Sequence, residues 1–300
     1  MNAVSCVKIV EVGPRDGLQN ESNIVDIKIK LALIEKLEKA GVSTIEAGSF
    51  VSAKWVPQMA ASDLIYSQLN WREGVSYPAL IPNIQGLERA LSVGVKEVNC
   101  FTAASEAFNQ KNINCSIEES LQRIKVLVDK SLLAGVPVRG YVSCIAGCPY
   151  QGEVDFDSVK RVSEALFELG CYEVALGDTI GVATPGKIVD LLNYLSASLP
   201  LNKIGLHLHD TYGQALANIY AGLQCGITTF DSSVAGLGGC PYAKGASGNV
   251  ATEDLVYMFR GMDIDTGIDL PALVEAGNFI SNALGRANAS KVAVALNGKQ

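Results

Sequence analysis

A short pattern recurs along this 300-residue chain: a helix-like stretch ends in small residues and a glycine, and a β-branched stretch follows. Its five copies are Lys39-Ala40-Gly41-Val42, Ser92-Val93-Gly94-Val95, Leu133-Ala134-Gly135-Val136, Glu168-Leu169-Gly170-Cys171 and Gln224-Cys225-Gly226-Ile227. Glycine after the last helical residue can adopt the left-handed conformation that ends a helix. The repeat therefore predicts a regular alternation of helices and strands.

The segments between these joints predict eight strands. They lie near residues 7–12, 43–48, 77–81, 96–101, 138–144, 172–177, 203–209 and 228–234. Several are apolar on both faces, which is typical of strands buried in a parallel sheet. Eight such strands alternating with helices over about 250 residues favour a (β/α)8 barrel, also called a TIM barrel. A doubly wound sheet is the alternative fold.

Amphipathic stretches fill the gaps between the strands. Apolar residues recur at helical spacing in 27–39, and Ser116 with Glu119 forms a capping box that begins another helix. Further helices are predicted at 155–169, 184–195, 212–224 and 270–284. No linker or charge block divides the chain. We expect one catalytic domain over 1–300, with the barrel at about 7–262 and a C-terminal helical extension at about 263–300.

Composition excludes several classes of protein. A hydrophobic fraction of 48% supports a sizeable core, and a net charge of −7 disfavours an electrostatic nucleic-acid binder. No apolar run reaches the 18–20 residues or so of a membrane-spanning helix, and the first residues do not resemble a signal peptide. We expect a cytoplasmic protein with no nucleic-acid or membrane partner. Its eight cysteines should then be reduced, and most of them small buried thiols.

Two glycine-rich segments fail as phosphate-binding motifs. The segment 181–188 nearly matches the loop GxxxxGK[ST], but Ile188 replaces the hydroxyl residue and Pro185 removes an N–H donor. It is better interpreted as a turn with proline in the first turn of a helix. The segment 236–241 does not match GxGxxG, and the first strand-to-helix turn lacks a dinucleotide fingerprint.

The chain contains two histidines, His207 and His209, separated by one residue. On a strand, residues i and i+2 point to the same side, with their Cα atoms about 6–7 Å apart. They form a natural chelating pair, although two core histidines adjacent by chance are the alternative. Asp16 adds a carboxylate at the same barrel rim, and Asn249 could add a carbonyl oxygen. Mixed nitrogen and oxygen ligands suit Mg or Mn, with Zn or Fe as alternatives.

Two further residues suggest chemistry near this pair. Arg15 precedes Asp16, and it could stabilise a developing enolate or carboxylate oxygen, or form a structural ion pair with Glu46 or Asp178. Cys240 lies in a glycine-rich segment that could close over a substrate. Its flanking glycines argue against a packing role.

Three segments resemble the 3-hydroxy-3-methylglutaryl-CoA (HMG-CoA) lyase family, within the wider group of barrels that share an Arg-Asp motif on the first strand. They are Gly13-Pro-Arg-Asp-Gly-Leu-Gln-Asn-Glu21, His207-Leu-His-Asp-Thr-Tyr-Gly213 and the most specific, Ser233-Val-Ala-Gly-Leu-Gly-Gly-Cys-Pro-Tyr-Ala243 continuing to Gly248-Asn-Val-Ala-Thr-Glu253. The similarity covers residues 7–285 or so. It implies a metal-dependent barrel that cleaves HMG-CoA to acetyl-CoA and acetoacetate, as in leucine degradation, and a homodimer.

The resemblance also implies roles for individual residues. Asp16, His207, His209 and Asn249 would ligate the metal, Arg15 would stabilise the enolate of acetyl-CoA, and Cys240 would transfer a proton. A supporting substrate-binding shell would contain Gln19, Glu46, Ser49, Tyr141 and Asp178. The segment 109–114 resembles the family's region near the acyl-CoA, so Lys111 could meet a phosphate beside Asn112.

Four other functions remain open at this point. A related lyase could accept a bulkier substrate such as the isohexenyl analogue, and a transferase could run the condensation direction. Such transferases usually carry extra C-terminal domains and a different sequence after the Arg-Asp pair. A non-enzymatic metal-binding barrel and an iron oxygenase with two histidines and one carboxylate are the other two.

Overall fold

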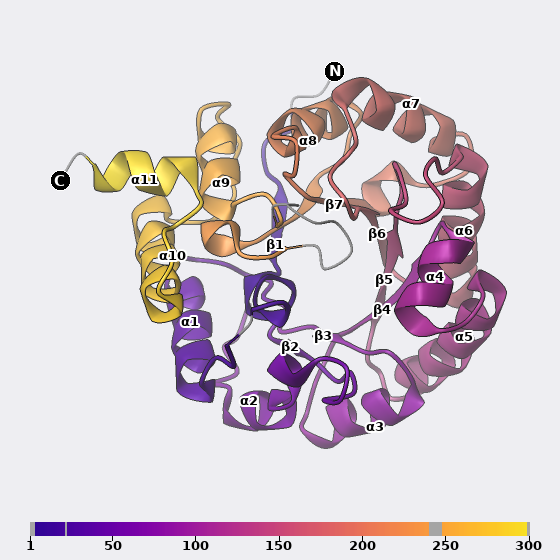
Figure 1. Ribbon diagram of the computed structural model, residues 1–300, viewed down its shortest axis with the longest axis horizontal. Coiled ribbons are helices and arrows are strands. Elements are labelled where there is room, and N and C mark those ends of the chain that lie inside the picture. The colour runs from indigo at the N-terminus through magenta and orange to yellow at the C-terminus, as the bar shows by residue number, and fades with distance from the viewer. Residues whose placement is uncertain (1–3, 22, 240–247, 299–300) are drawn as a thin grey trace.

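The computed structural model describes residues 4–21, 23–239 and 248–298. Figure 1 looks along a ring of strands that is surrounded by helices. The strands are β1 (Lys8–Glu11), β2 (Gly48–Ser49), β3 (Ala79–Leu80), β4 (Val98–Ala103), β5 (Val138–Ser143), β6 (Glu173–Asp178), β7 (Ile204–Leu208) and β8 (Thr229–Ser232). All pairings between them are parallel.

The sheet closes on itself. From β2 to β8 each strand pairs with the next in chain order, and β8 pairs with β1. The remaining gap is bridged at Glu11 and Ile45, where Glu11 N donates to Thr44 O and Glu46 N donates to Glu11 O, both at 2.9 Å. The predicted barrel is therefore confirmed, and the doubly wound sheet is excluded.

The helices form the outer layer. They are α1 (Ile27–Lys39), α2 (Ser62–Gln68), α3 (Ile84–Ser92), α4 (Glu106–Ile113), α5 (Ile117–Leu133), α6 (Phe156–Leu169), α7 (Pro185–Leu195), α8 (Ala215–Gln224), α9 (Thr252–Arg260), α10 (Leu270–Leu284) and α11 (Lys291–Asn297). The main apolar core lies between them and the strands. Figure 1 shows α10 and α11 beside α9, on the α1 side of the barrel. No described helix is long and apolar enough to cross a membrane.

The glycine joints behave as the repeat predicted. All five have positive φ angles, between 73° and 106°: Gly41, Gly94, Gly135, Gly170 and Gly226. The capping box at Ser116 and Glu119 is also confirmed, and α7 begins with Pro185 in its first turn, as predicted.

Some boundaries differ from the prediction. Residues 43–48 were expected to form a strand, but regular pairing occurs only at Gly48–Ser49, with single bridges at Thr44 and Ile45. The helix expected from residue 212 begins at Ala215, because Gly213 has a φ of 68° that interrupts helical geometry. Among the described cysteines, Cys6 is exposed and Cys225 is half-buried, whereas the other five are buried.

Candidate active site

A tight turn at the end of β1 carries the Arg-Asp pair. Residues Gly13–Gly17 form a single π-helical turn, closed by a 3.1 Å hydrogen bond from Gly17 N to Val12 O. A Cβ atom on Gly17 would lie 2.6 Å from Ser233 Oγ, so the turn packs against the segment after β8 only with glycine there. This packing places Arg15 and Asp16 at the carboxyl end of the barrel, where enzymes of this fold carry their active sites.

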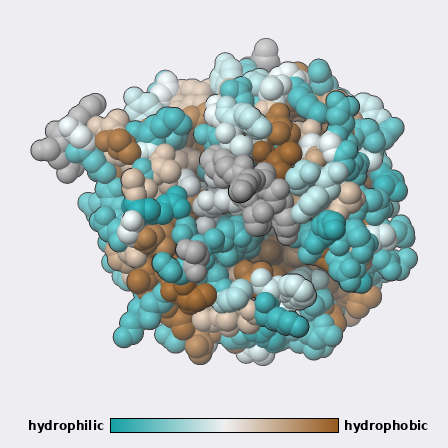
Figure 2. Space-filling view, in the orientation of Figure 1, coloured by the Kyte–Doolittle hydropathy of each residue, from teal (hydrophilic) through white to brown (hydrophobic). Residues whose placement is uncertain are grey.

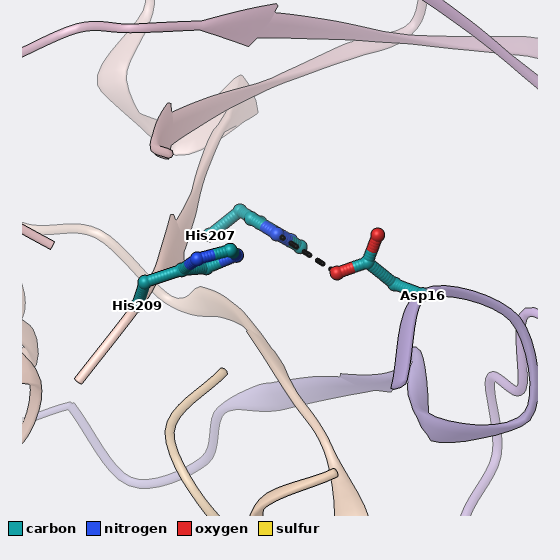
Figure 3. Close-up of side chains that lie close together, drawn as sticks. All are labelled: Asp16, His207 and His209. Carbon is teal, nitrogen blue, oxygen red and sulfur yellow. Dashed lines mark ion pairs between the residues drawn. The ribbon is translucent and has the colours of Figure 1, made fainter. Parts of the chain in front are cut away.

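The two histidines meet Asp16 from the opposite side. His207 lies in β7 and His209 follows its end, and Figure 3 shows both rings pointing toward the Asp16 carboxylate. His207 Nε2 lies 3.6 Å from Asp16 Oδ2, and the two ring centroids are 5.5 Å apart. One potential ligand atom from each residue lies within 4.8 Å of the others. The three residues thus form a possible metal site.

Asn249 completes one side of this cluster. Its backbone forms an isolated antiparallel β-bridge with that of His209, and its Nδ2 donates to Asp16 Oδ2 at 2.8 Å. Among the described residues, neither Asn249 Oδ1 nor His209 Nδ1 has a hydrogen-bond partner, although both are buried. Unsatisfied buried acceptors are unfavourable unless something else binds them. The Asp16 carboxylate oxygen, the nitrogens of the two imidazole rings and the Asn249 amide oxygen are therefore a ligand set that fits a divalent cation.

Electrostatics keeps two ligands deprotonated. Burial tends to raise the pKa of Asp16, but Arg15, His207 and His209 together lower it to about 2. Burial, with the neighbouring His207, lowers the pKa of His209 to about 4. Both groups are thus in their metal-binding protonation states at neutral pH, because a metal requires a carboxylate and a neutral imidazole.

Arg15 bridges two carboxylates. Its Nε and Nη2 atoms each lie 2.7 Å from Glu46 Oε2, and Nη1 lies 2.6 Å from Asp16 Oδ1. Its Cζ atom lies 6.0 Å from the ring centroid of Tyr141. The side chain is only 6% exposed. Of the two partners considered for a structural ion pair, Glu46 is therefore the one that Arg15 contacts.

Sequence reasoning missed the residues beneath His207. Asp231 in β8 lies 3.1 Å from His207 Nδ1, and Arg139 in β5 binds the Asp231 carboxylate with two nitrogens. A signal was present, because each is a charged residue inside a stretch predicted to be a buried strand. The prediction was limited to strand ends, where barrels carry their active sites, so it did not include these interior positions.

The remaining predicted residues occupy varied positions. Gln19 Nε2 donates to Asp16 Oδ1 at 3.2 Å, and Ser49 Oγ donates to Leu80 O at 3.1 Å. The Asp178 carboxylate accepts hydrogen bonds from Val182 N and Ala183 N, which orders the turn after β6. Lys111 and Asn112 are exposed on α4, and Cys240 lies outside the described residues.

Some residues of the cluster and its surroundings are partly exposed. Figure 2, in the orientation of Figure 1, shows a hollow near the centre of the face in view. Asp16, Gln19 and Phe101 are partly exposed, although Phe101 lies within β4 among buried neighbours. Phe101 packs against a small apolar cluster formed by Leu80, Tyr141 and Ala175, separate from the main core.

Comparisons with known proteins agree on one family. A family model described as HMGL-like matches residues 6–280. The mitochondrial hydroxymethylglutaryl-CoA lyase of Macaca fascicularis is 56% identical over 96% of the chain and 89% of its own length. A 3-hydroxy-3-isohexenylglutaryl-CoA/hydroxy-methylglutaryl-CoA lyase of Pseudomonas aeruginosa is 54% identical over the whole of both chains. The crystal structure of a hydroxymethylglutaryl-CoA lyase from that organism superposes with a TM-score of 0.98, at 54% identity over the full length of both chains.

Proposed function

The chain belongs to the HMGL-like family, and we propose that Asp16, His207, His209 and Asn249 hold the divalent metal with which it acts. Its reaction is the cleavage of the carbon–carbon bond of HMG-CoA, which yields acetyl-CoA and acetoacetate. The observation that carries the site assignment is the meeting of Asp16, His207 and His209 beside Arg15 at the carboxyl end of the barrel.

The metal that suits this ligand set best is Mg or Mn. Oxygen ligands from Asp16 and Asn249 favour hard cations, whereas a site with thiolates would favour zinc or copper. When bound, the ion supplies a Lewis acid that lowers the pKa of the C3 hydroxyl of the substrate.

Arg15 stabilises the charge that develops on the thioester. The C3 hydroxyl loses its proton and C3 becomes the ketone of acetoacetate, while the electron pair of the broken C2–C3 bond stays on the acetyl-CoA fragment, as an enolate. Arg15 is held by Glu46 and Asp16, so its guanidinium is fixed before the reaction begins. Preorganised donors of this kind contribute most where charge develops, because they need no reorganisation. Cys240 then protonates the enolate carbon, since the thiol is a suitable general acid if its pKa lies near the working pH.

The other predicted residues assist binding. Gln19 donates to Asp16 Oδ1, the oxygen that also accepts from Arg15, and Tyr141 covers the Arg15 guanidinium. Ser49 and Asp178 lie at the carboxyl ends of β2 and β6, where Ser49 binds Leu80 O and Asp178 orders the turn after β6. Lys111 and Asn112, exposed on the helix after β4, would meet a phosphate of CoA.

A bulkier substrate is a second candidate, supported by the name of the Pseudomonas relative. The apolar cluster of Leu80, Tyr141 and Ala175, with Phe101 packed against it, lies beside Arg15 and His207. It offers apolar surface to the substituent on C3. Specificity constants for HMG-CoA and its isohexenyl analogue would rank the two substrates.

Two further expectations concern the state of the protein in the cell. We propose a homodimer, from the family resemblance, and a cytoplasmic location. Light scattering coupled to size exclusion would measure the former, and fractionation of the source cells would test the latter.

Chelation followed by metal addition tests the function as a whole. Enzyme treated with EDTA should release no acetoacetate from HMG-CoA, and addition of Mg²⁺ or Mn²⁺ should restore release. Absence of product with both ions would contradict the assignment. Activity that depended on dioxygen and iron would instead favour the oxygenase.

A further inference from the structure

A buried network of charges lies beneath the metal-binding cluster. Arg139, at the second position of β5, is only 1% exposed. Its Nη1 donates to Asp231 Oδ2 at 3.0 Å and its Nη2 donates to Asp231 Oδ1 at 2.8 Å. Its Nε donates to Glu173 Oε1 at 2.6 Å, and Nη1 also contacts the Tyr141 hydroxyl at 3.0 Å. The guanidinium therefore fixes the plane of the Asp231 carboxylate.

Asp231 in turn contacts His207. The two residues are register partners on β7 and β8, and Asp231 Oδ2 lies 3.1 Å from His207 Nδ1. A carboxylate can only accept hydrogen bonds, so the proton of the neutral ring stands on Nδ1. The lone pair then remains on Nε2, the nitrogen that faces Asp16 at 3.6 Å.

We propose that Asp231 and Arg139 are positioning residues for the metal ligand His207: Asp231 selects the tautomer that presents Nε2, and Arg139 holds Asp231 in place. The inference rests on the proposed function, in which His207 binds the metal. Carboxylates that accept from the second nitrogen of a ligating histidine serve this purpose in many metal sites.

A merely structural role accounts less well for the arrangement. A buried arginine–carboxylate pair is costly to desolvate, and apolar residues of similar size often stabilise a core as well. Here the same oxygen that accepts from Arg139 also meets His207. The Arg139–Asp231 pair therefore orients a residue of the site, His207, and does more than fill space in the core.

Nuclear magnetic resonance of the unmodified protein gives a first test. The chain has only two histidines, so tag-free protein labelled with ¹⁵N-histidine gives the ring-nitrogen signals of two imidazoles, two from each. The His207→Gln variant assigns the signal that disappears to His207. At a pH where the metal-free ring is neutral, we expect His207 to carry its proton on Nδ1, and we expect its Nε2 signal to shift on addition of Mg²⁺. An Nε2–H form would overturn the proposal.

Metal affinity provides the second test. An amide has one acceptor oxygen where the carboxylate has two, so the Asp231→Asn side chain must turn an NH2 group toward an Arg139 donor and no longer carries the charge that binds the His207 Nδ1–H. We expect its dissociation constant for Mn²⁺, measured by electron paramagnetic resonance, to rise about 10–100-fold. Arg139→Lys keeps the positive charge but cannot bind both Asp231 oxygens with two nitrogens. Its Mn²⁺ affinity should therefore fall less than that of Asp231→Asn.

Asp254→Asn is the matched control. Asp254 is also buried, and it caps α11 through Ser290 and the Val292 backbone. This variant should lose thermal stability while its Mn²⁺ affinity stays within twofold of wild type. A folded Asp231→Asn protein with wild-type affinity would overturn the inference alone. A wild-type protein that neither binds Mn²⁺ nor cleaves HMG-CoA would overturn the proposed function as well. If Asp231→Asn does not fold, the tautomer of wild-type His207 still decides.

Discussion

The Glu46 carboxylate holds Arg15 at the mouth of the barrel, with Arg15 Nε and Nη2 each 2.7 Å from Glu46 Oε2. The other oxygen of Glu46 accepts a hydrogen bond from Asn99 Nδ2 at 2.7 Å. Glu46 is fully buried, so water does not compete for these contacts. One carboxylate thus converts a flexible arginine into a fixed donor beside the metal-binding cluster.

We expect Glu46→Gln to lower kcat for HMG-CoA by about a hundredfold, because small misplacements of a catalytic group cost that much. The Mn²⁺ dissociation constant should change little, since Glu46 does not contact the ligand cluster directly. Steady-state kinetics and a metal titration measure both effects. Glu38→Gln, which removes an ion pair with Arg72 elsewhere, is the control and should keep its kcat. A kcat within twofold of wild type would contradict the role given to Glu46.

Gly181 restricts the backbone next to His209. It has a φ of 67°, and a Cβ atom there would lie 2.9 Å from His209 O and 2.7 Å from Thr211 Oγ1. We expect Gly181→Ala to be destabilised by backbone strain of about 1–2 kcal/mol and also to bind Mn²⁺ more weakly, because His209 must shift. Gly213→Ala is the control, with a φ of 68° but no atom within 4 Å of the added Cβ. It should lose similar stability from strain alone and keep its affinity. Equal Mn²⁺ affinities in the two variants would argue against the clash.

Glu253 should make the folded state less stable as pH rises. Burial raises its pKa to about 8, with a further contribution from the nearby Glu11, whereas the pKa of a glutamate in the unfolded chain is about 4.3. Below the unfolded value this group favours folding fully, and that contribution is lost as pH rises through about 8. We expect the Glu253 contribution to fall by on the order of 1–3 kcal/mol between pH 5 and pH 8.

Urea unfolding at pH 5, 6.5 and 8 measures this dependence. Glu253→Gln cannot ionise but keeps an oxygen that can accept from Ala235 N, the contact Glu253 makes in the fold. Its free energy of unfolding should therefore fall less steeply with pH than that of wild type. Parallel curves for the two proteins would show that Glu253 does not titrate in this range.

Cys240→Ala should leave metal binding intact and lower the turnover of HMG-CoA by orders of magnitude, because the acetyl-CoA enolate would lack its general acid. Cys225→Ala is a suitable control, since Cys225 is a half-buried thiol at the end of α8. Turnover measured at saturating Mg²⁺, together with Mn²⁺ affinity, separates the two roles. Undiminished turnover in Cys240→Ala would remove this residue from the mechanism.

Much of the architecture could be predicted from local patterns. The glycine joints require a left-handed residue after each helix, and this requirement is local, so the alternation of helices and strands was predictable. The strand pairing of residues 43–48 was less predictable, because it depends on how β1 and the segment before β3 approach from either side. Interior charges such as Arg139 were not anticipated, since a single charged residue in an apolar strand does not reveal its partner.

The sequence by itself determined which side chains stand at the strand ends, because in a parallel barrel every carboxyl end faces one rim. It therefore predicted that Arg15, Asp16, His207 and His209 lie at the same rim of the barrel. Only the tertiary structure decided how they meet. Asp16 approaches His207 because a π-helical turn packs on the segment after β8, and His207 is oriented by an aspartate one strand away. Contacts between residues distant in the chain depend on strand register and on close packing, neither of which is encoded in a local pattern.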